Sequence, residues 1–329
     1  MNNWKVIDAT GLKKTNEEFN CMIFIHERAG FLFGTNYTDD ILLNKKFNEQ
    51  NAVIYKTDDS GKKWTANSAG KGYFIDALFI EGDLYALSNK PSKDSYAYID
   101  SSSLFVSIDT GKNWTSVFTF PFYVREIKFE NSQSGVAITK KQNEKSQWKV
   151  LKTNNGGKKW EEVLETPSIE DPLFANNMLW YFSKNQIGDY RLNSVNVGSK
   201  ILNNEKMPYG FEPRKITLDI FNDFWLAGLQ DKNTVIYHRD KMGKYSLVKR
   251  FEDQNFYPVY INIIENSFSV VLGEMKLPSV EYRFFRSSDN GKSWLEEPLL
   301  IKSYLRPVCF YKDLVWAYSG AGRIQVRDH

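Results

Sequence analysis

Short stretches in which apolar and polar residues alternate recur along the chain, and each ends at a cluster of turn-forming residues. Residues 52–56 read Ala-Val-Ile-Tyr-Lys, and residues 103–106 read Ser-Leu-Phe-Val. Alternation with a period of two, in segments rich in β-branched and aromatic residues, is typical of half-buried β-strands. Both stretches lead into a glycine-containing turn, after which a second short strand begins at a tryptophan. The pattern therefore predicts an all-β protein built from short strands.

The turns between these strands follow one pattern. Four segments match Ser/Thr-x-Asp/Asn-x-Gly-Lys-x-Trp, at residues 57–64, 107–114, 153–160 and 287–294, and a degenerate fifth copy occupies 238–245. We call the four matching segments the repeated turn. Its Asp or Asn side chain can accept hydrogen bonds from turn N–H groups, its Gly tolerates positive φ, and its Trp can pack back over the turn. We therefore expect purely structural roles for Asp59, Gly61, Trp64, Asp109, Gly111, Trp114, Asn155, Gly157, Trp160, Asp289, Gly291 and Trp294.

The spacing of the repeated turn predicts the architecture. Trp64, Trp114 and Trp160 are successively 50 and 46 residues apart, and 85 residues separate Trp160 from Tyr245 of the degenerate copy. A period of 45–50 residues is that of a four-stranded propeller blade, so the longer interval holds two blades, one of them without its turn. We assign six blades to about 18–68, 72–118, 122–165, 168–203, 212–251 and 257–298.

The end of the chain supplies three further strands, one short of a seventh blade. The N-terminal segment Asn-Trp-Lys-Val-Ile-Asp (3–8) resembles the segment 113–118 that follows a repeated turn. We therefore predict a seven-bladed β-propeller, a single domain over residues 1–329, in which residues 301–329 and 1–9 together form the last blade. Such closure removes the open edge that a sheet would otherwise expose. Six blades with a ragged last unit is the alternative.

The repeated turn resembles the Asp box, also called the BNR repeat, of sialidases and related propellers. Among these, the chain is similar in fold and repeat to the seven-bladed propellers that assist photosystem II assembly. The resemblance implies fold more strongly than activity, since propellers host many unrelated functions. A sialidase would add an arginine triad, a Tyr/Glu nucleophile pair and an Asp acid, but its N-terminal Arg-Ile-Pro-type motif is absent here.

Composition narrows the environment and the partners. The net charge is only +3, which does not favour nucleic acid as a partner, and no apolar run approaches the length of a membrane span. Two cysteines, Cys21 and Cys309, are too few for a disulfide framework, and we expect buried thiols. No signal peptide is recognisable. We expect a cytoplasmic protein that is monomeric apart from its partner.

Metal and cofactor chemistry receive little support from the sequence. The three histidines, His26, His238 and His329, fall in different predicted blades, and the Asp residues of the repeated turn do not form an EF-hand loop. We therefore predict no metal site, no cofactor and no catalytic residue.

We letter the four strands of each predicted blade A to D from the axis outward. A protein-binding surface is expected on the face that carries the D–A links and the B–C loops, which we call the top face. Aromatic residues and arginines crowd these segments, and two long loops, about 35–51 and 89–102, add acidic side chains. Of the aromatics we expect Tyr96, Tyr209 and Phe211 to be exposed. The predicted partner-binding residues are Asp39, Asp40, Glu49, Asp94, Tyr96, Tyr98, Phe122, Tyr123, Arg125, Tyr209, Phe211, Arg214, Tyr257, Tyr304 and Arg306.

Three of these residues, Arg125, Arg214 and Arg306, recur near the starts of innermost strands. They could converge on the central axis and hold an anion, or they could only line the channel, paired with neighbouring carboxylates such as Glu126 or Asp171.

The sequence thus favours a non-enzymatic propeller that caps or scaffolds a partner protein. An immunity protein or antitoxin that inhibits a toxin by covering its active site is the narrower hypothesis, with the acidic loop residues meeting a basic site. The alternative is a sialidase-like glycoside hydrolase or carbohydrate-binding propeller, which clustered carboxylates at the axial mouth would favour.

Overall fold

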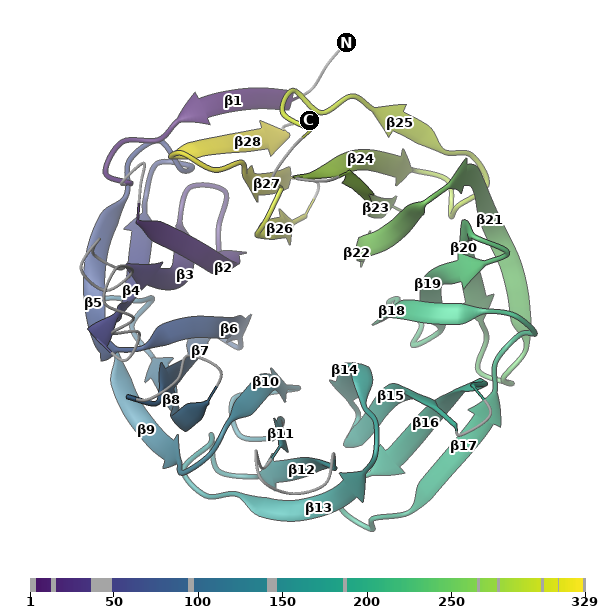
Figure 1. Ribbon diagram of the computed structural model, residues 1–329, viewed down its shortest axis with the longest axis horizontal. Coiled ribbons are helices and arrows are strands. Elements are labelled where there is room, and N and C mark those ends of the chain that lie inside the picture. The colour runs from purple at the N-terminus through teal and green to yellow at the C-terminus, as the bar shows by residue number, and fades with distance from the viewer. Residues whose placement is uncertain are drawn as a thin grey trace.

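The strands of the protein form seven four-stranded antiparallel sheets arranged as a ring around a central axis (Figure 1). The structure is a computed structural model that describes residues 4–12, 16–36, 49–93, 98–140, 147–185, 188–264, 267–276, 279–302, 305–312 and 314–327. Within these ranges there is no helix long and apolar enough to cross a membrane.

Each blade is named by its order in the chain, and its strands run A to D from the axis outward. Blade 1 consists of β2 (Glu17–Phe24), β3 (Gly30–Asn36), β4 (Asn51–Thr57) and β5 (Thr65–Lys71), and blade 2 of β6 (Tyr73–Ile80), β7 (Asp83–Pro91), β8 (Ile99–Ser107) and β9 (Thr115–Phe120). Blade 3 consists of β10 (Val124–Phe129), β11 (Gly135–Lys140), β12 (Trp148–Thr153) and β13 (Glu161–Thr166), and blade 4 of β14 (Glu170–Ala175), β15 (Met178–Lys184), β16 (Tyr190–Asn196) and β17 (Leu202–Lys206). The strands of blades 5 to 7 are β18 (Glu212–Leu218), β19 (Phe224–Gln230), β20 (Asn233–Arg239), β21 (Tyr245–Gln254); β22 (Phe256–Ile264), β23 (Ser267–Lys276), β24 (Ser279–Ser287), β25 (Leu295–Glu297); β26 (Val308–Tyr311), β27 (Leu314–Tyr318), β28 (Arg323–Arg327) and β1 (Trp4–Asp8).

The N-terminal strand closes the ring. In blade 7 the order is β26-β27-β28-β1, and β1 pairs antiparallel with β28 from Trp4 opposite Arg327 to Asp8 opposite Arg323 (Figure 1). The prediction of seven blades with a shared last blade is therefore confirmed, and the six-blade alternative is wrong. The predicted blade boundaries agree with the observed strands to within a few residues.

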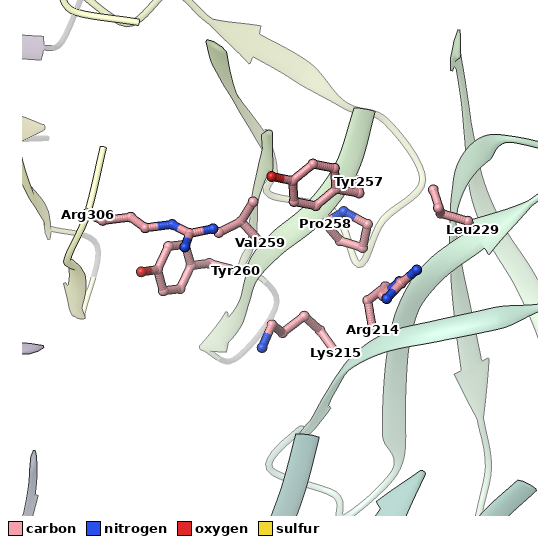
Figure 2. Close-up of a pocket in the computed structure, with 8 residues that line it drawn as sticks. All are labelled: Arg214, Lys215, Leu229, Tyr257, Pro258, Val259, Tyr260 and Arg306. Carbon is pink, nitrogen blue, oxygen red and sulfur yellow. The ribbon is translucent and has the colours of Figure 1, made fainter. Parts of the chain in front are cut away.

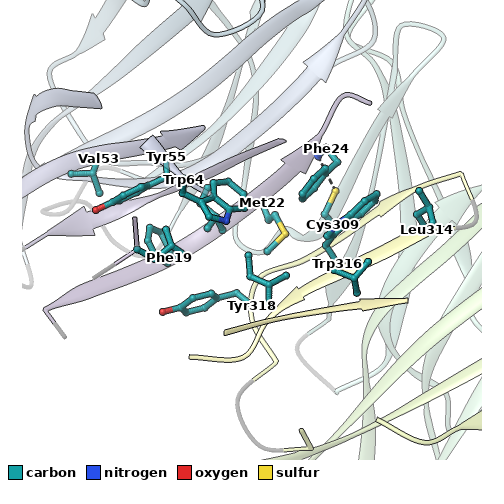
Figure 3. Close-up of a cluster of buried hydrophobic side chains, with 14 residues drawn as sticks. Phe19, Met22, Phe24, Val53, Tyr55, Trp64, Cys309, Leu314, Trp316 and Tyr318 are labelled. Carbon is teal, nitrogen blue, oxygen red and sulfur yellow. Dashed lines mark hydrogen bonds between the residues drawn. The ribbon is translucent and has the colours of Figure 1, made fainter. Parts of the chain in front are cut away.

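The hydrophobic core lies between the blades. The buried apolar side chains of the described residues form seven clusters, and each joins two neighbouring blades. Between blades 7 and 1, Phe24 stacks on Trp316 with ring centroids 3.9 Å apart, and Cys309 lies in the same cluster (Figure 3). Cys309 and Cys21 are free thiols, and the Cys309 sulfur accepts a hydrogen bond from the Phe24 N–H at 3.2 Å.

The repeated turn is held by its own side chains. In blade 2, the Asp109 carboxylate accepts hydrogen bonds from the Ser107 hydroxyl at 2.8 Å and from the Asn113 N–H at 2.9 Å. Gly111 has φ of +77°, and a Cβ there would lie 2.2 Å from the Phe31 ring of blade 1. Glycine is therefore required both for the turn and for the close approach of two blades.

Two blades without an intact repeated turn are fastened by buried arginines instead. Arg239, at the end of β20, makes two hydrogen bonds of 2.5 and 2.6 Å to Glu205 on the outer strand of blade 4. Arg327, at the end of β28, makes two of 2.5 and 2.8 Å to Glu297 on the outer strand of blade 6. A guanidinium held by two bonds to one carboxylate is among the stronger polar contacts in proteins, so each pair clamps two neighbouring blades.

We predict that replacing Trp4 by alanine destabilises the whole ring. Trp4 is 3% exposed and meets Phe284 of blade 6 edge-on at 5.2 Å, so its loss should lower the free energy of unfolding by about 3–5 kcal/mol. Val6, on the same strand but 39% exposed, provides the control: Val6→Ala should cost under about 1 kcal/mol. Urea unfolding followed by fluorescence measures both. Equal midpoints for the two variants would contradict closure by β1.

The repeated turn also predicts a dependence of stability on pH. Hydrogen bonds from the backbone and side chain of Asn113 lower the pKa of Asp109 to about 2, so the ionised form stabilises the folded state above the ordinary Asp pKa of about 3.9. That contribution is lost as the pH falls through about 2. Asp109→Asn retains a side-chain oxygen that can accept hydrogen bonds from backbone N–H groups, as the oxygen of Asn155 does in blade 3. The stability difference between wild type and Asp109→Asn should therefore shrink between pH 4 and pH 2 in urea titrations.

The exposed Asp58, whose ion pair with Lys56 spans 3.5 Å, provides a control for general effects of charge. The difference between wild type and Asp58→Asn should show no comparable loss over that interval. A constant difference for Asp109→Asn from pH 6 to pH 2 would contradict the assigned role of its carboxylate.

Candidate functional site

The innermost strands carry a bulge near the top face, and this bulge positions the side chains at the axial mouth. In each of blades 1 to 6 the pairing of strands A and B shifts register near the start of strand A. The shift lies between Pro213 and Lys215 in blade 5 and between Pro258 and Tyr260 in blade 6. A bulge redirects side chains out of the normal alternation, so Arg214 and its neighbour Lys215 can both line the mouth.

A cavity of about 540 Å³ opens at the axial mouth where blades 5, 6 and 7 meet. Figure 2 shows Arg306 and Lys215 extending from opposite sides toward Tyr260, which lies between them. Arg306 precedes β26, and its N–H donates to the Tyr318 carbonyl at 3.1 Å. The lining residues are Arg214, Lys215, Leu229, Tyr257, Pro258, Val259, Tyr260 and Arg306.

The lining is cationic and offers hydrogen-bond donors. Lys215 is paired with Asp171 of blade 4 at 2.7 Å, and Arg214 lies 3.7 Å from Glu212 in an exposed pair. Arg306 has no carboxylate partner within the described ranges. Its guanidinium is therefore the group best placed to bind an anion.

The neighbouring phenols remain protonated at neutral pH. Burial raises the pKa of Tyr260, and Arg306 only partly opposes that shift. Burial likewise raises the pKa of Tyr282, whose hydroxyl lies beside Arg306. A guanidinium with phenolic O–H groups next to it matches a carboxylate, which accepts hydrogen bonds only.

Arg125 does not join Arg214 and Arg306 at the mouth. Its guanidinium donates to Glu126 and to the Ile169 carbonyl at 2.9 Å, and lies 4.3 Å from the centre of the Trp148 ring. Of the two alternatives for the three arginines, Arg125 therefore follows the second: it is paired with the neighbouring carboxylate Glu126 and is also held by a carbonyl and an indole ring. Arg214 and Arg306 do line one cavity.

Asp76 and Glu126, on the innermost strands of blades 2 and 3, belong to one network of polar contacts. Asp76 accepts from the Ile127 N–H of blade 3 at 2.9 Å, and Glu126 lies 3.3 Å from Lys128. Burial raises the pKa of Asp76. Burial alone would also raise that of Glu126, but Lys128 and Arg125 hold it below its ordinary value. Burial would lower the pKa of Lys128, yet the facing carboxylates raise it instead. This network links blades 2 and 3.

The link between blades 4 and 5 follows the same design. The Asp171 carboxylate accepts from the Ile216 N–H at 2.6 Å as well as from Lys215. Among the described residues, none that lines the cavity at the mouth carries a carboxylate.

The predicted aromatic residues of the top face have different environments. Tyr209 is 99% exposed and Tyr98 is 53% exposed, as a contact surface requires. Phe211 is buried at 3% and meets Tyr237 edge-on at 5.0 Å, so the expectation that it is exposed is wrong. Its side chain fills the wedge between blades 4 and 5 rather than the surface.

The other predicted partner-binding residues are partly accessible to solvent or lie outside the described residues. Phe122 and Tyr123 are half-buried, Tyr257 lines the mouth, and Glu49 is exposed. The remaining five lie outside the described residues: Asp39, Asp40, Asp94, Tyr96 and Tyr304.

A second cavity, of about 630 Å³, lies next to the mouth on the top face between blades 4 and 5. It is lined by residues 188–191 and 206–212, including Tyr209 and Glu212. Because Glu212 also faces Arg214, the two cavities adjoin along the start of β18.

The structure also brings together one cluster that the sequence did not indicate. Asp219, Asp223 and His238 lie close to one another on the opposite face of blade 5. The three histidines fall in different predicted blades, so their spacing gives no sign of this cluster. The missing signal was an Asp-x-x-x-Asp turn beside a strand that carries a histidine.

We predict that Phe211→Ala and Tyr209→Ala differ sharply in stability although the residues are two positions apart. Loss of the buried Phe211 ring should lower the free energy of unfolding by about 3–5 kcal/mol, while loss of the exposed Tyr209 ring should change it by about 0.5 kcal/mol or less. Thermal and urea unfolding measure both. Similar losses for the two variants would contradict the orientation of this link.

Solved structures of similar fold agree with this architecture. YCF48 bound to D1 peptide is 14% identical, with a TM-score of 0.68 over 100% of this chain and 98% of that chain. The β-propeller domain of the Trilobed protease from Pyrococcus furiosus is 10% identical, with a TM-score of 0.61 over 92% and 91%. The WD40 β-propeller domain of Doa1 is 11% identical, with a TM-score of 0.59 over 99% and 97%.

At these identities the likeness shows the fold alone. Neither family models nor curated protein sequences match the chain. The comparisons therefore support the β-propeller fold, and one of the similar structures was solved with a peptide bound.

Proposed function

We propose that this chain is a protein-binding propeller that holds a carboxylate of its partner at the axial mouth. The main evidence is the cavity between blades 5, 6 and 7, where the guanidinium of Arg306 lies beside Tyr260 and the described lining residues include no carboxylate. An acidic side chain or a free C-terminus would supply the charge that this lining does not contain.

The size and surroundings of the mouth support a peptide segment as the ligand. The mouth cavity adjoins the second cavity on the top face, and the exposed Tyr209 lines the latter. A rigid aromatic ring beside a cationic anchor is typical of protein-binding hot spots. The likeness to YCF48, solved with a D1 peptide, is consistent with this use of the fold.

The finer classification is part of the proposal. The hydrogen-bonded turns at Asp59, Asp109 and Asp289, each with a glycine at positive φ two residues later, support assigning the repeats to the Asp-box type. We further propose a cytoplasmic protein that acts on its partner without catalysis. The glycoside hydrolase alternative needs an acid and a base flanking a substrate. The described residues that line the mouth cavity include no carboxylate for these roles.

The immunity or inhibitor hypothesis stays a prediction. It depends on acidic residues of the two long loops, of which Glu49 and Asp100 are described and exposed. The cationic mouth favours an acidic partner segment over the basic site of a nuclease.

We predict that Arg306→Gln weakens binding of acidic peptides at least tenfold, because a charge-assisted pair with a carboxylate contributes about 1.5–3 kcal/mol. The measurement is fluorescence polarisation with a set of peptides ending in Asp or Glu with free carboxylates, and the same peptides with the side-chain and C-terminal carboxylates both replaced by amides. Arg306→Lys, which keeps the charge but not the planar fork, should give an intermediate affinity.

Arg28→Gln is the matched control, since Arg28 is exposed on the opposite face and its loss changes the net charge equally. It should leave affinity within about twofold. Binding that falls equally in both variants, or no difference between carboxylate and amidated peptides, would overturn the proposed site. Melting curves of all variants exclude unfolding as the cause.

A further inference from the structure

Asp219, Asp223 and His238 form a compact donor set on the face opposite the mouth. The two aspartates flank the turn between β18 and β19, and His238 lies on the adjacent strand β20, paired with Trp225. One ligand atom of each residue lies within 4.8 Å of the others, and the His238 Nε2 is 3.2 Å from an Asp223 oxygen. Two donors bound to one zinc ion at 2.0–2.1 Å lie about 3.3 Å apart, so this separation fits a shared ion.

The turn holds the Asp219 carboxylate in a fixed orientation. One oxygen accepts from the Phe221 and Asp223 N–H groups at 2.8 and 3.0 Å, and the other accepts from the Trp225 indole at 3.0 Å. The indole ring also packs against His238, with ring centroids 4.7 Å apart. Such outer contacts are what orients the ligands of metal sites.

The turn does not itself require a second negative charge. In blade 3 the corresponding A–B turn is capped by Asn131, whose neutral side-chain oxygen accepts from the Gln133 and Ser134 N–H groups. In blade 5 the cap is a carboxylate with another carboxylate four residues later. Within the described ranges, His238 is the ion-pair partner of this pair, and no Lys or Arg contacts either aspartate.

The second oxygen of Asp223, beside the one that contacts His238, has no hydrogen-bond donor among the described groups. This oxygen, Oδ1, is buried. An unsatisfied buried carboxylate oxygen is costly, and coordination of a cation would satisfy it.

We propose that Asp219, Asp223 and His238 bind one divalent first-row transition ion, for which Zn²⁺ is the probe. One imidazole and two carboxylates are the mixed nitrogen and oxygen donors that such ions accept, whereas Ca²⁺ and Mg²⁺ prefer oxygen alone. The ion ties the turn to β20 and holds Ile220 and Phe221, which are 64% and 60% exposed, out from the rim. This proposal does not depend on the proposed function of the mouth.

The test is equilibrium dialysis of the chelator-treated full chain against Zn²⁺ and, separately, Co²⁺. Wild type should bind one equivalent that Asp223→Asn and His238→Gln lose, with affinity reduced at least tenfold. His26→Gln is the matched control, because His26 is exposed in a turn of blade 1, and it should retain that equivalent. Without metal, Asp223→Asn should melt close to wild type, because the Asp223 Oδ1 that the substitution can replace accepts no hydrogen bond from any described group.

The Co²⁺ spectrum tests the donor set without any variant. Wild type should show visible bands of a nitrogen and oxygen site and no thiolate charge-transfer band, which excludes Cys21 and Cys309 as ligands. Equal stoichiometry in wild type and both variants, loss in His26→Gln, a thiolate band, or displacement of Zn²⁺ by equimolar Ca²⁺ would each overturn the proposal.

Discussion

Pairing between the first and the last strand of the chain is the constraint on which the rest of the structure depends. Because each hydrophobic cluster lies between two blades, no blade buries its apolar faces until both neighbours are in place. Blade 7 receives its outer strand from the N-terminus, and Trp4 then fills the wedge against blade 6. Arg306 and Leu305 lie in the segment that enters this blade, so the cationic mouth exists only in the closed ring.

The closed ring offers two faces with different chemistry. On the top face, bulges in the innermost strands redirect Arg214 and Lys215 toward the axis, while carboxylates deeper in the channel are occupied by backbone amides and lysines of the next blade. Among the described residues that line the mouth, Arg306 is the cation without a carboxylate partner. On the opposite face, the Asp or Asn side chain of each repeated turn accepts hydrogen bonds from the backbone of that turn, whereas blade 5 carries the cluster Asp219, Asp223 and His238.

The fold could be predicted from the sequence because the repeated turn marks a fixed place in each blade, and the spacing of its tryptophans counts the blades. The side chains of the mouth were harder to place. A bulge interrupts the alternation on which inward and outward assignments depend, so the sequence left open whether Arg125 reaches the axis or pairs with Glu126, as it does. Phe211 was expected at the surface because links are usually exposed, but it fills an inter-blade wedge. The proximity of Asp219 to His238 arises from the pairing of β19 with β20, so the Asp-x-x-x-Asp turn indicates a site only together with that pairing.

Amide hydrogen exchange with and without a bound acidic peptide tests directly whether the axial mouth binds the partner, because it maps the binding site without altering the protein. Binding at the mouth should protect the top ends of blades 5, 6 and 7, in the segments around Arg214, Tyr260 and Arg306, with little change at the repeated turns on the opposite face. Protection confined to the opposite face, or to the outer strands of blades 1 to 3, would contradict it.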